Sequence, residues 1–284
     1  MRLLRFFAPD GSVHLGLRQG DNIRDLGRRE PLDPIPADVI AAAPLIPAAG
    51  LRLDAPIRSV PKLLALAGNY HKHIVESGFS ETGSRWTPQV FWKPSTSILE
   101  PGGKVALRSN NVFFDWEAEL AVVIGRRAKD LPVSEAMSCV FGYTIINDLS
   151  ERKFNGQIEN RDKRESDPFF DWLMGKWFDG SAPLGPEIVT VDEVSDPHNL
   201  PIRLWLNDEK MQDANTSAMI FRIPETIAAI SAVLTLEPGD VIAMGTPEGV
   251  GFARGRALRA GDHLRVEIEG LGTLDTFIVE EPSK

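Results

Sequence analysis

The chain has 284 residues, 43% of them hydrophobic and 25% charged, and its 40 acidic and 31 basic side chains give a formal charge of −9. This composition is typical of a soluble globular protein that is long enough to bury its own core. The acidic balance makes nucleic acid a poor candidate partner, and no apolar stretch reaches the roughly 18 residues of a membrane span. Cys139 is the only cysteine, which excludes an intramolecular disulfide and favours a reducing compartment, the cytoplasm.

The N-terminal part of the sequence predicts a small β-rich unit. Strand-like runs at residues 3–7, 13–19 and 22–27 are separated by turn signals at residues 9–11 and 20–21. Residues 28–61 are rich in Pro and Ala, which permits one or two short helical pieces, and we interpret them as a linker and covering segment. We therefore expect a small N-terminal β-rich domain with its linker over residues 1–58 and a larger domain over residues 59–284.

The larger domain is predicted to be mostly strands with few helices. Strand signals cover residues 89–93, the long run 111–125 and the apolar run 141–148. Helices are expected over residues 131–140 and from Pro224 to about residue 234, where Pro occupies the favoured first turn. The tail returns to strand patterns at residues 241–253, 263–270 and 272–280, so the sequence predicts a β-rich α+β fold.

Two glutamates in the longest strand signal form a candidate metal site. Side chains two residues apart in a strand share a face, so Glu117 and Glu119 are expected to project together. An isolated pair of this kind is commonly a solvated acidic face, but the apolar flanks predict burial, where two carboxylates need a cation. Asp148 ends the apolar run 141–148 and is a possible third ligand, or else a turn or N-cap residue. Three oxygen ligands suit Mg²⁺, Mn²⁺ or Ca²⁺.

A second candidate group lies at residues 67–78. His73 and Glu76 are three residues apart, so on a helix they would share a face and could act as a general base with its orienting carboxylate. A surface pair without function is the alternative. His71 cannot share the helical face of His73, so at most one of the two histidines points into a site.

A lysine and a glycine-rich loop complete the candidates. Lys176 is flanked by large apolar side chains, where it either extends to solvent or supplies positive charge to a bound anion. Residues 245–251, GTPEGVG, offer backbone N–H groups and the Thr246 hydroxyl to a carboxylate, but they match neither a P-loop nor a dinucleotide-binding fingerprint.

Five segments taken together resemble the fumarylacetoacetate hydrolase superfamily. They are AGNYHKHIVESG (67–78), WEAELAVVIG (116–125), NDLSER (147–152), GKWFDG (175–180) and GTPEGVG (245–251). The resemblance covers roughly residues 60–284. It implies the mixed β-sandwich roll of that family, preceded here by a small N-terminal β domain, and a homodimer.

The resemblance also implies roles for individual residues. Glu117, Glu119 and Asp148 match the metal-binding carboxylates, which commonly hold Mg²⁺ or Mn²⁺, with Ca²⁺ possible. His73 and Glu76 match the pair that activates water in acylpyruvate hydrolases. Residues expected to hold or polarise substrate oxygens are Lys176, Arg152, Thr246, Gly245 and Asn155. Asn155 stands where many members have Gln, and Gly180 where many have Thr, so contacts on that side depart from the family pattern.

The implied function is a metal-dependent hydrolase that cleaves a C–C bond in an acylpyruvate or diketo acid, in the catabolism of aromatic compounds or sugar acids. The partner is a small oxo acid, and the charged segment 156–168 is a solvated loop that could border the entrance to the site. An oxaloacetate-type decarboxylase or a hydroxymuconate-type isomerase could use the same site. A metal-binding scaffold without catalysis is a further alternative, against which the retained His73, Glu76 and Lys176 argue.

Overall fold

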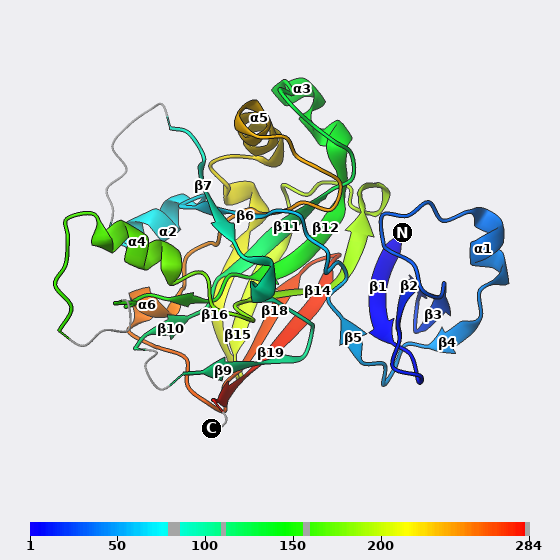
Figure 1. Cartoon of the computed structure of the whole chain (residues 1–284), viewed down its shortest axis with the longest axis horizontal. Helices are drawn as coiled ribbons and strands as arrows, with labels where there is room; N and C mark the ends of the chain where they lie inside the picture. Colours follow the sequence, from blue (N-terminus) through cyan, green and yellow to red (C-terminus); the bar gives the residue numbers. More distant parts are fainter. Residues whose placement is uncertain (79–85, 109–111, 156–159, 282–284) are drawn as a thin grey trace.

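A computed structural model describes residues 1–78, 86–108, 112–155 and 160–281. The molecule consists of a large sheet that runs through it, a smaller sheet packed on one of its faces, and a few short helices (Figure 1). The β-rich fold predicted from the sequence is therefore confirmed.

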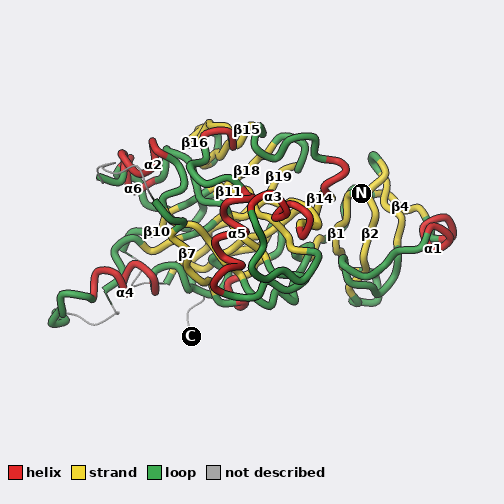
Figure 2. Tube along the Cα trace, turned by 90° about the horizontal axis from the view of Figure 1, so that it is seen from above, coloured by secondary structure: helices red, strands yellow, loops and turns green. Residues whose placement is uncertain are grey.

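The large sheet joins the N-terminal strands to the rest of the protein. Its strands run, in spatial order, β4 (Leu45–Pro47), β3 (Asn22–Asp25), β2 (Val13–Gln19), β1 (Arg2–Phe7), β14 (Ala182–Thr190), β12 (Val140–Asn147), β11 (Ala118–Ile124), β17 (Val241–Ala243), β6 (Leu63–Ala67) and β7 (Gln89–Lys93). Two short strands pair with its members, β5 (Leu53–Asp54) with β1 and β8 (Ile98–Leu99) with β14. The antiparallel pairing of β1 with β14 makes the N-terminal unit an extension of the main sheet, and Figure 2 shows it at one end of the molecule.

The second sheet has five strands. They are, in spatial order, β16 (Glu209–Asn215), β15 (Pro201–Leu206), β18 (His263–Ile268), β19 (Gly272–Glu280) and β9 (Gly103–Leu107). The largest hydrophobic cluster lies between the two sheets, where Leu120 and Val122 of β11 meet Leu204, Leu264 and Val266. Ala121 and Val123, on the opposite face of β11, belong to a second cluster, so this strand is buried on both faces, as its continuous apolar run indicates.

The helices are short. They are α1 (Ala37–Ala42), α2 (His71–Glu76), α3 (Val133–Ala136), α4 (Asp167–Met174), α5 (Ile223–Val233) and α6 (Gly251–Arg254). Single 3₁₀ turns occupy Ser95–Ser97, Met137–Cys139, Val191–Glu193 and Thr216–Ala218. Within the described residues, no helix is long and apolar enough to cross a membrane.

The structure differs from the strand expectations at three places. The strand pattern over residues 241–253 is realised only as β17, and its last residues belong to α6. The strand signal over residues 111–125 is interrupted, because β10 (Phe114–Asp115) leaves the large sheet to pair with β13 (Ser150–Glu151) before β11 begins. The presumed linker contributes β4 and β5 to the sheet, so it is more than a covering segment. The domain boundary between residues 58 and 59 stays a prediction.

The two helices predicted from the sequence are both present. The helix expected over residues 131–140 is reduced to α3 and the 3₁₀ turn that follows it, because the chain enters β12 at Val140. The helix at Pro224 is found as α5, with Pro224 in its first turn.

Candidate active site

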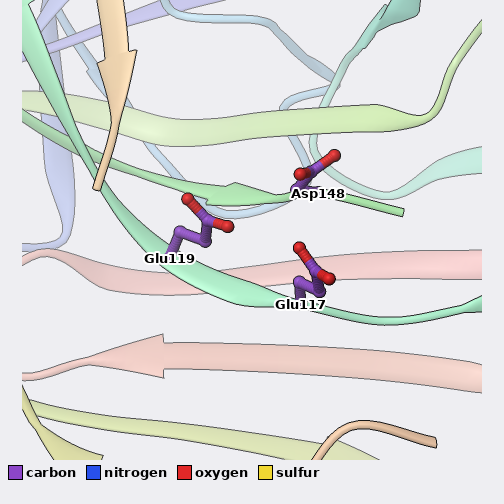
Figure 3. A group of neighbouring side chains, drawn as sticks. All are labelled: Glu117, Glu119 and Asp148. Atoms are coloured by element: carbon purple, nitrogen blue, oxygen red, sulfur yellow. The ribbon is translucent and has the colours of Figure 1, made fainter. Parts of the chain in front are cut away.

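Three carboxylates converge where β11 begins and β12 ends (Figure 3). Glu119 is in β11, Glu117 directly precedes this strand, and Asp148 directly follows β12. The antiparallel pairing of the two strands brings their ends together, and the Asp148 N–H donates to the Glu117 carbonyl at 2.9 Å. One oxygen from each side chain lies within 4.8 Å of the others, and all three residues are buried.

Three cations lie against this cluster. Lys176 Nζ donates to Glu117 Oε2 and to Asp148 Oδ2, in each case at 2.7 Å. Lys93 Nζ donates to Asp148 Oδ1 at 2.6 Å, and Arg152 Nη2 lies 2.5 Å from Glu117 Oε1. Buried carboxylates need such partners, because an unpaired charge in a protein interior is strongly unfavourable.

The cations hold Glu117 in its ionised form. Burial alone would raise the pKa of Glu117, but the charges of Arg152 and Lys176, followed by that of His73, outweigh it and keep this pKa well below its usual range. Burial would lower the pKa of Lys176, but Asp148 and Glu117 outweigh it and raise this pKa.

Glu119 differs from its two neighbours. Its Oε2 accepts the Gly245 N–H at 2.7 Å, while its Oε1 is buried without a hydrogen-bond partner among the described residues. Burial, and then the negative charges of Asp148 and Glu117, raise the pKa of Glu119 well above its usual value.

The cluster fits a divalent cation. Glu119, whose Oε1 has no partner among the described residues, and the two further carboxylates form an all-oxygen donor set that Mg²⁺, Mn²⁺ and Ca²⁺ prefer. A cation there would satisfy this oxygen and remove the repulsion that raises the pKa of Glu119. The three carboxylates singled out from the sequence therefore could hold a metal ion.

His73 and Glu76 both belong to α2, so the helical geometry on which their pairing depends is present. His73 Nδ1 lies 2.9 Å from Glu76 Oε1, an arrangement that leaves Nε2 as the second ring nitrogen for chemistry. Glu76 Oε2 also accepts the Gly249 N–H at 2.8 Å. His71, at the start of the same helix, instead lies against Trp86, with ring centroids 6.0 Å apart.

The glycine-rich loop 245–251 binds the protein's own site residues. Besides the Gly245 bond to Glu119, the Thr246 hydroxyl donates to the Ala118 carbonyl at 3.0 Å and accepts from Gln212 Nε2 at 2.9 Å. Gly245 adopts a φ of +82°, and a Cβ there would lie 2.8 Å from Asn69 Cβ, so glycine is required at this turn. The expected contacts of Thr246 and Gly245 with substrate stay predictions.

Arg152 follows β13 and is mostly buried, with its Nε donating to Asp115 Oδ2 at 2.8 Å. Asn155 lies exposed in the loop that follows, and its role with substrate stays a prediction. Of the charged segment 156–168, residues 156–159 lie outside the described part. The remainder is mainly exposed, with Arg161 and Arg164 paired to the acidic residues Asp167 and Asp171 of α4.

Sequence reasoning missed three buried polar residues that support this site. Lys93 is fully buried and contacts Asp148, Asp115 is fully buried and contacts Arg152, and Gln212 bonds both to Thr246 and to the Ala118 N–H. The one signal for Asp115 is its place two residues before Glu117. Lys93 and Gln212 stand in ordinary strand patterns, which carry no such signal.

Comparison with known proteins identifies the family. Residues 62–279 match the family model described as "Fumarylacetoacetate (FAA) hydrolase C-terminal". The mitochondrial oxaloacetate tautomerase fahd2 of Xenopus laevis is 35% identical, over 98% of this chain and 90% of its own. A crystal structure of 5-carboxymethyl-2-hydroxymuconate delta-isomerase from Mycobacterium smegmatis is 33% identical, with a TM-score of 0.79 and 100% of both chains covered.

A maleylpyruvate hydrolase from Sphingobium sp. SYK-6, solved with manganese(II) and pyruvate, is 30% identical, with a TM-score of 0.76 and 99% of both chains covered. These similarities confirm the resemblance seen in the five sequence segments, together with the fold that it implied. The chain belongs to the fumarylacetoacetate hydrolase superfamily, a group of enzymes whose named members include hydrolases, isomerases and tautomerases.

Proposed function

We propose that this protein is a divalent-metal-dependent hydrolase that cleaves a C–C bond in an acylpyruvate or a related diketo acid. The observation that supports this reaction best is the His73–Glu76 pair, a general base with its carboxylate, tied to three buried carboxylates by one loop. The loop 245–251 donates hydrogen bonds both to Glu76 and to Glu119. The manganese(II) and pyruvate in the related maleylpyruvate hydrolase are the kinds of ligand that such a site would take.

The residues of the chain divide the reaction between them. His73 takes a proton from water while Glu76 stabilises the imidazolium, and the resulting hydroxide attacks the distal carbonyl carbon of the substrate. The C–C bond then breaks, and its electron pair stays with the pyruvate fragment as an enolate, beside the ammonium group of Lys176. The enolate carbon regains the proton from His73, so one water is consumed and pyruvate and a carboxylic acid are released.

We infer that Glu117, Glu119 and Asp148 hold Mg²⁺ or Mn²⁺ during this reaction. Such an ion would supply positive charge to the carboxylate and 2-oxo oxygens of the substrate. Arg152 and Lys176, which lie against two of the three carboxylates, are suited to binding the same oxygens.

A second candidate activity is tautomerisation of oxaloacetate. It is favoured by the curated relatives of that name, which are 35% identical over 98% of this chain. The same base would move a proton between C3 and the 2-oxo oxygen, without water attack or bond cleavage. A decarboxylase or a hydroxymuconate-type isomerase would form the same kind of enolate and remains an alternative.

The test is a spectrophotometric assay of the purified protein with Mn²⁺ or Mg²⁺, with an EDTA control. The panel contains small acylpyruvates, oxaloacetate and a 2-hydroxymuconate, and the products are identified by their masses. EDTA-sensitive release of pyruvate and an acid from an acylpyruvate would support the hydrolase. Enol–keto exchange of oxaloacetate without cleavage would contradict the hydrolase assignment and support a tautomerase. Loss of CO₂ would indicate a decarboxylase.

We also propose that the protein works as a homodimer, as the family resemblance implies, and in the cytoplasm, the reducing compartment that its single cysteine favours. Light scattering during gel filtration measures the mass in solution. A mass of one chain, 31.3 kDa, at micromolar concentration would contradict the dimer.

A further inference from the structure

Asp115 is a buried carboxylate outside the set of residues used so far in the reaction. It is completely inaccessible to solvent, and each of its oxygens accepts two hydrogen bonds. Oδ1 accepts the N–H groups of Trp116 at 2.8 Å and Gly251 at 2.6 Å. Oδ2 accepts the Phe252 N–H at 3.0 Å and the Arg152 Nε–H at 2.8 Å. Among the described residues, four donors, one of them cationic, satisfy this carboxylate.

These four bonds join three parts of the site. The pairing of β10 with β13 brings Asp115 beside the chain that leads to Arg152. The Gly251 and Phe252 bonds fix the end of the loop 245–251, where it enters α6. A Cβ on Gly251 would lie 2.6 Å from Asp115 Oδ1 and 2.2 Å from the Arg256 carbonyl oxygen, so the backbone approaches the carboxylate too closely for any other residue.

The same loop holds the base pair. Two residues before Gly251, the Gly249 N–H donates to Glu76 Oε2 at 2.8 Å, and Glu76 in turn holds His73. The Gly249 carbonyl accepts the Trp116 indole N–H at 3.2 Å, which adds a second tie between the loop and the segment that carries Asp115. A displacement of Gly251 would therefore reach His73 through only two further hydrogen bonds.

We propose that Asp115 is a positioning residue. It holds the loop 245–251, and through this loop Glu76 and His73, in a fixed position relative to Glu117, which lies two residues along the chain from Asp115. Its bond to Arg152 fixes that guanidinium against Glu117 in the same way. One carboxylate thus sets the distance between the base and the carboxylate cluster. The effect of Asp115 on turnover rests on the proposed function, whereas its effect on the position of α2 does not.

The test compares Asp115→Asn with Asp240→Asn. Asp240 is equally buried, and its side chain accepts the Glu237 N–H and lies against the Lys62 ammonium group. Its carbonyl accepts the Ile124 N–H at the last residue of β11, the end of that strand opposite to the cluster. The side chain of Asn has the size of Asp, but its NH₂ group cannot accept the two hydrogen bonds that one carboxylate oxygen accepts in the wild type. Because small displacements of a base are costly, we expect kcat to fall about 10- to 100-fold, with KM changed less than about threefold. Asp240→Asn should leave both constants near those of the wild type.

Two further measurements separate positioning from a general loss of structure. In a Glu76→Gln background, Asp115→Asn should lower kcat by less than about threefold more. The link from the loop through Glu76 to His73 is already broken there, and only the bond to Arg152 is left to lose. Amide hydrogen exchange should rise at residues 249–252 and at 71–76 in Asp115→Asn, and in neither segment in Asp240→Asn. If Asp115→Asn does not fold, Asp115→Ser, which leaves a hydroxyl acceptor for Gly251, is measured in the same way.

Additive losses in the double variant, or unchanged exchange at residues 71–76, would overturn the proposal. If the wild-type protein turns over none of the substrates tested, the proposed function fails. The exchange comparison then decides the role of Asp115 by itself: faster exchange at residues 71–76 supports the proposal and unchanged exchange overturns it.

Discussion

Lys93 Nζ lies 2.6 Å from Asp148 Oδ1, in a position where neither side chain is exposed to solvent. The ammonium group also donates to the Lys176 carbonyl at 2.5 Å and to Ser181 Oγ at 3.2 Å, so its three donors meet three acceptors. Burial lowers the pKa of Lys93, but Asp148 opposes this effect. Lys93 therefore joins Asp148 of the carboxylate cluster to the backbone of Lys176, whose own ammonium group bonds the other oxygen of Asp148.

Replacing Lys93 by Met should destabilise the protein and impair the site. Breaking a buried ion pair from one side costs up to about 3–5 kcal/mol of unfolding free energy. Here Asp148 Oδ1 is left without its partner, although Oδ2 keeps Lys176. Urea denaturation measures this loss, and the assay of the wild-type substrate measures activity. Lys62→Met, which removes the partner of buried Asp240 away from the site, is the control and should lower stability but not turnover. Equal activity of both variants would contradict a role for Lys93 in holding Asp148.

Replacing Lys176 by Met should tighten metal binding while it lowers turnover. Lys176 Nζ lies 2.7 Å from both Glu117 Oε2 and Asp148 Oδ2, so a cation that uses these oxygens competes with the ammonium group for them. Removing a competing charge-assisted hydrogen bond should raise the affinity of the carboxylates for the cation about tenfold. Calorimetric titration with Mn²⁺ measures the change. Unchanged or weaker binding in the variant would show that the ammonium group and the cation do not compete for the carboxylates.

The local parts of the site could be predicted from the sequence. A two-residue spacing in extended backbone places Glu117, just before β11, together with Glu119. A three-residue spacing in a helix pairs His73 with Glu76, and both relationships depend on backbone periodicity alone. Asp148 could be suspected from its place at the end of an apolar run. The prediction of one continuous strand over residues 111–125 was wrong. The pairing of β10 with β13 interrupts it, and this pairing depends on contacts that no local pattern encodes.

The supporting residues could not be predicted, and the reason is the same for each. Lys93 reads as the end of an ordinary strand, and only the place of β7 beside β6, together with the approach of Ser181 and Asp148, makes it buried. Gln212 acts from β16 in the second sheet, far along the chain from the loop that it holds. Contacts between distant segments are set by tertiary packing, whereas a sequence pattern reports only on neighbours.

Of the two histidines in α2, only His73 should matter for catalysis. His73→Ala should lower kcat by about 100-fold or more, as expected for loss of a general base. Mn²⁺ affinity should change less than about threefold, because His73 makes no bond to the three carboxylates that the structure describes. His71→Ala removes a ring that lies against Trp86 and is the matched control, with activity near that of the wild type. Hydrolysis at the wild-type rate by His73→Ala would rule out the assignment of water activation to this residue.

His198 should make the stability of the protein sensitive to mild acid. Its Nε2 lies 3.1 Å from the Ile223 N–H at the start of α5 and must be unprotonated to accept this bond. Burial, and then the charge of Arg222, lower the pKa of His198 below its ordinary value of 6.5, against the opposite effects of Asp196 and Glu225.

The direction of the effect follows from proton binding. Between its lowered pKa and 6.5, His198 binds protons more readily in the unfolded chain than in the folded one. Its contribution to stability is therefore fully present above pH 6.5 and is lost as the pH falls toward the folded-state pKa. Urea midpoints at about pH 7.5 and about pH 5.5 should differ more for the wild type than for His198→Gln, which keeps an acceptor but cannot titrate. If both proteins lose the same stability over this interval, the acid sensitivity arises from other groups.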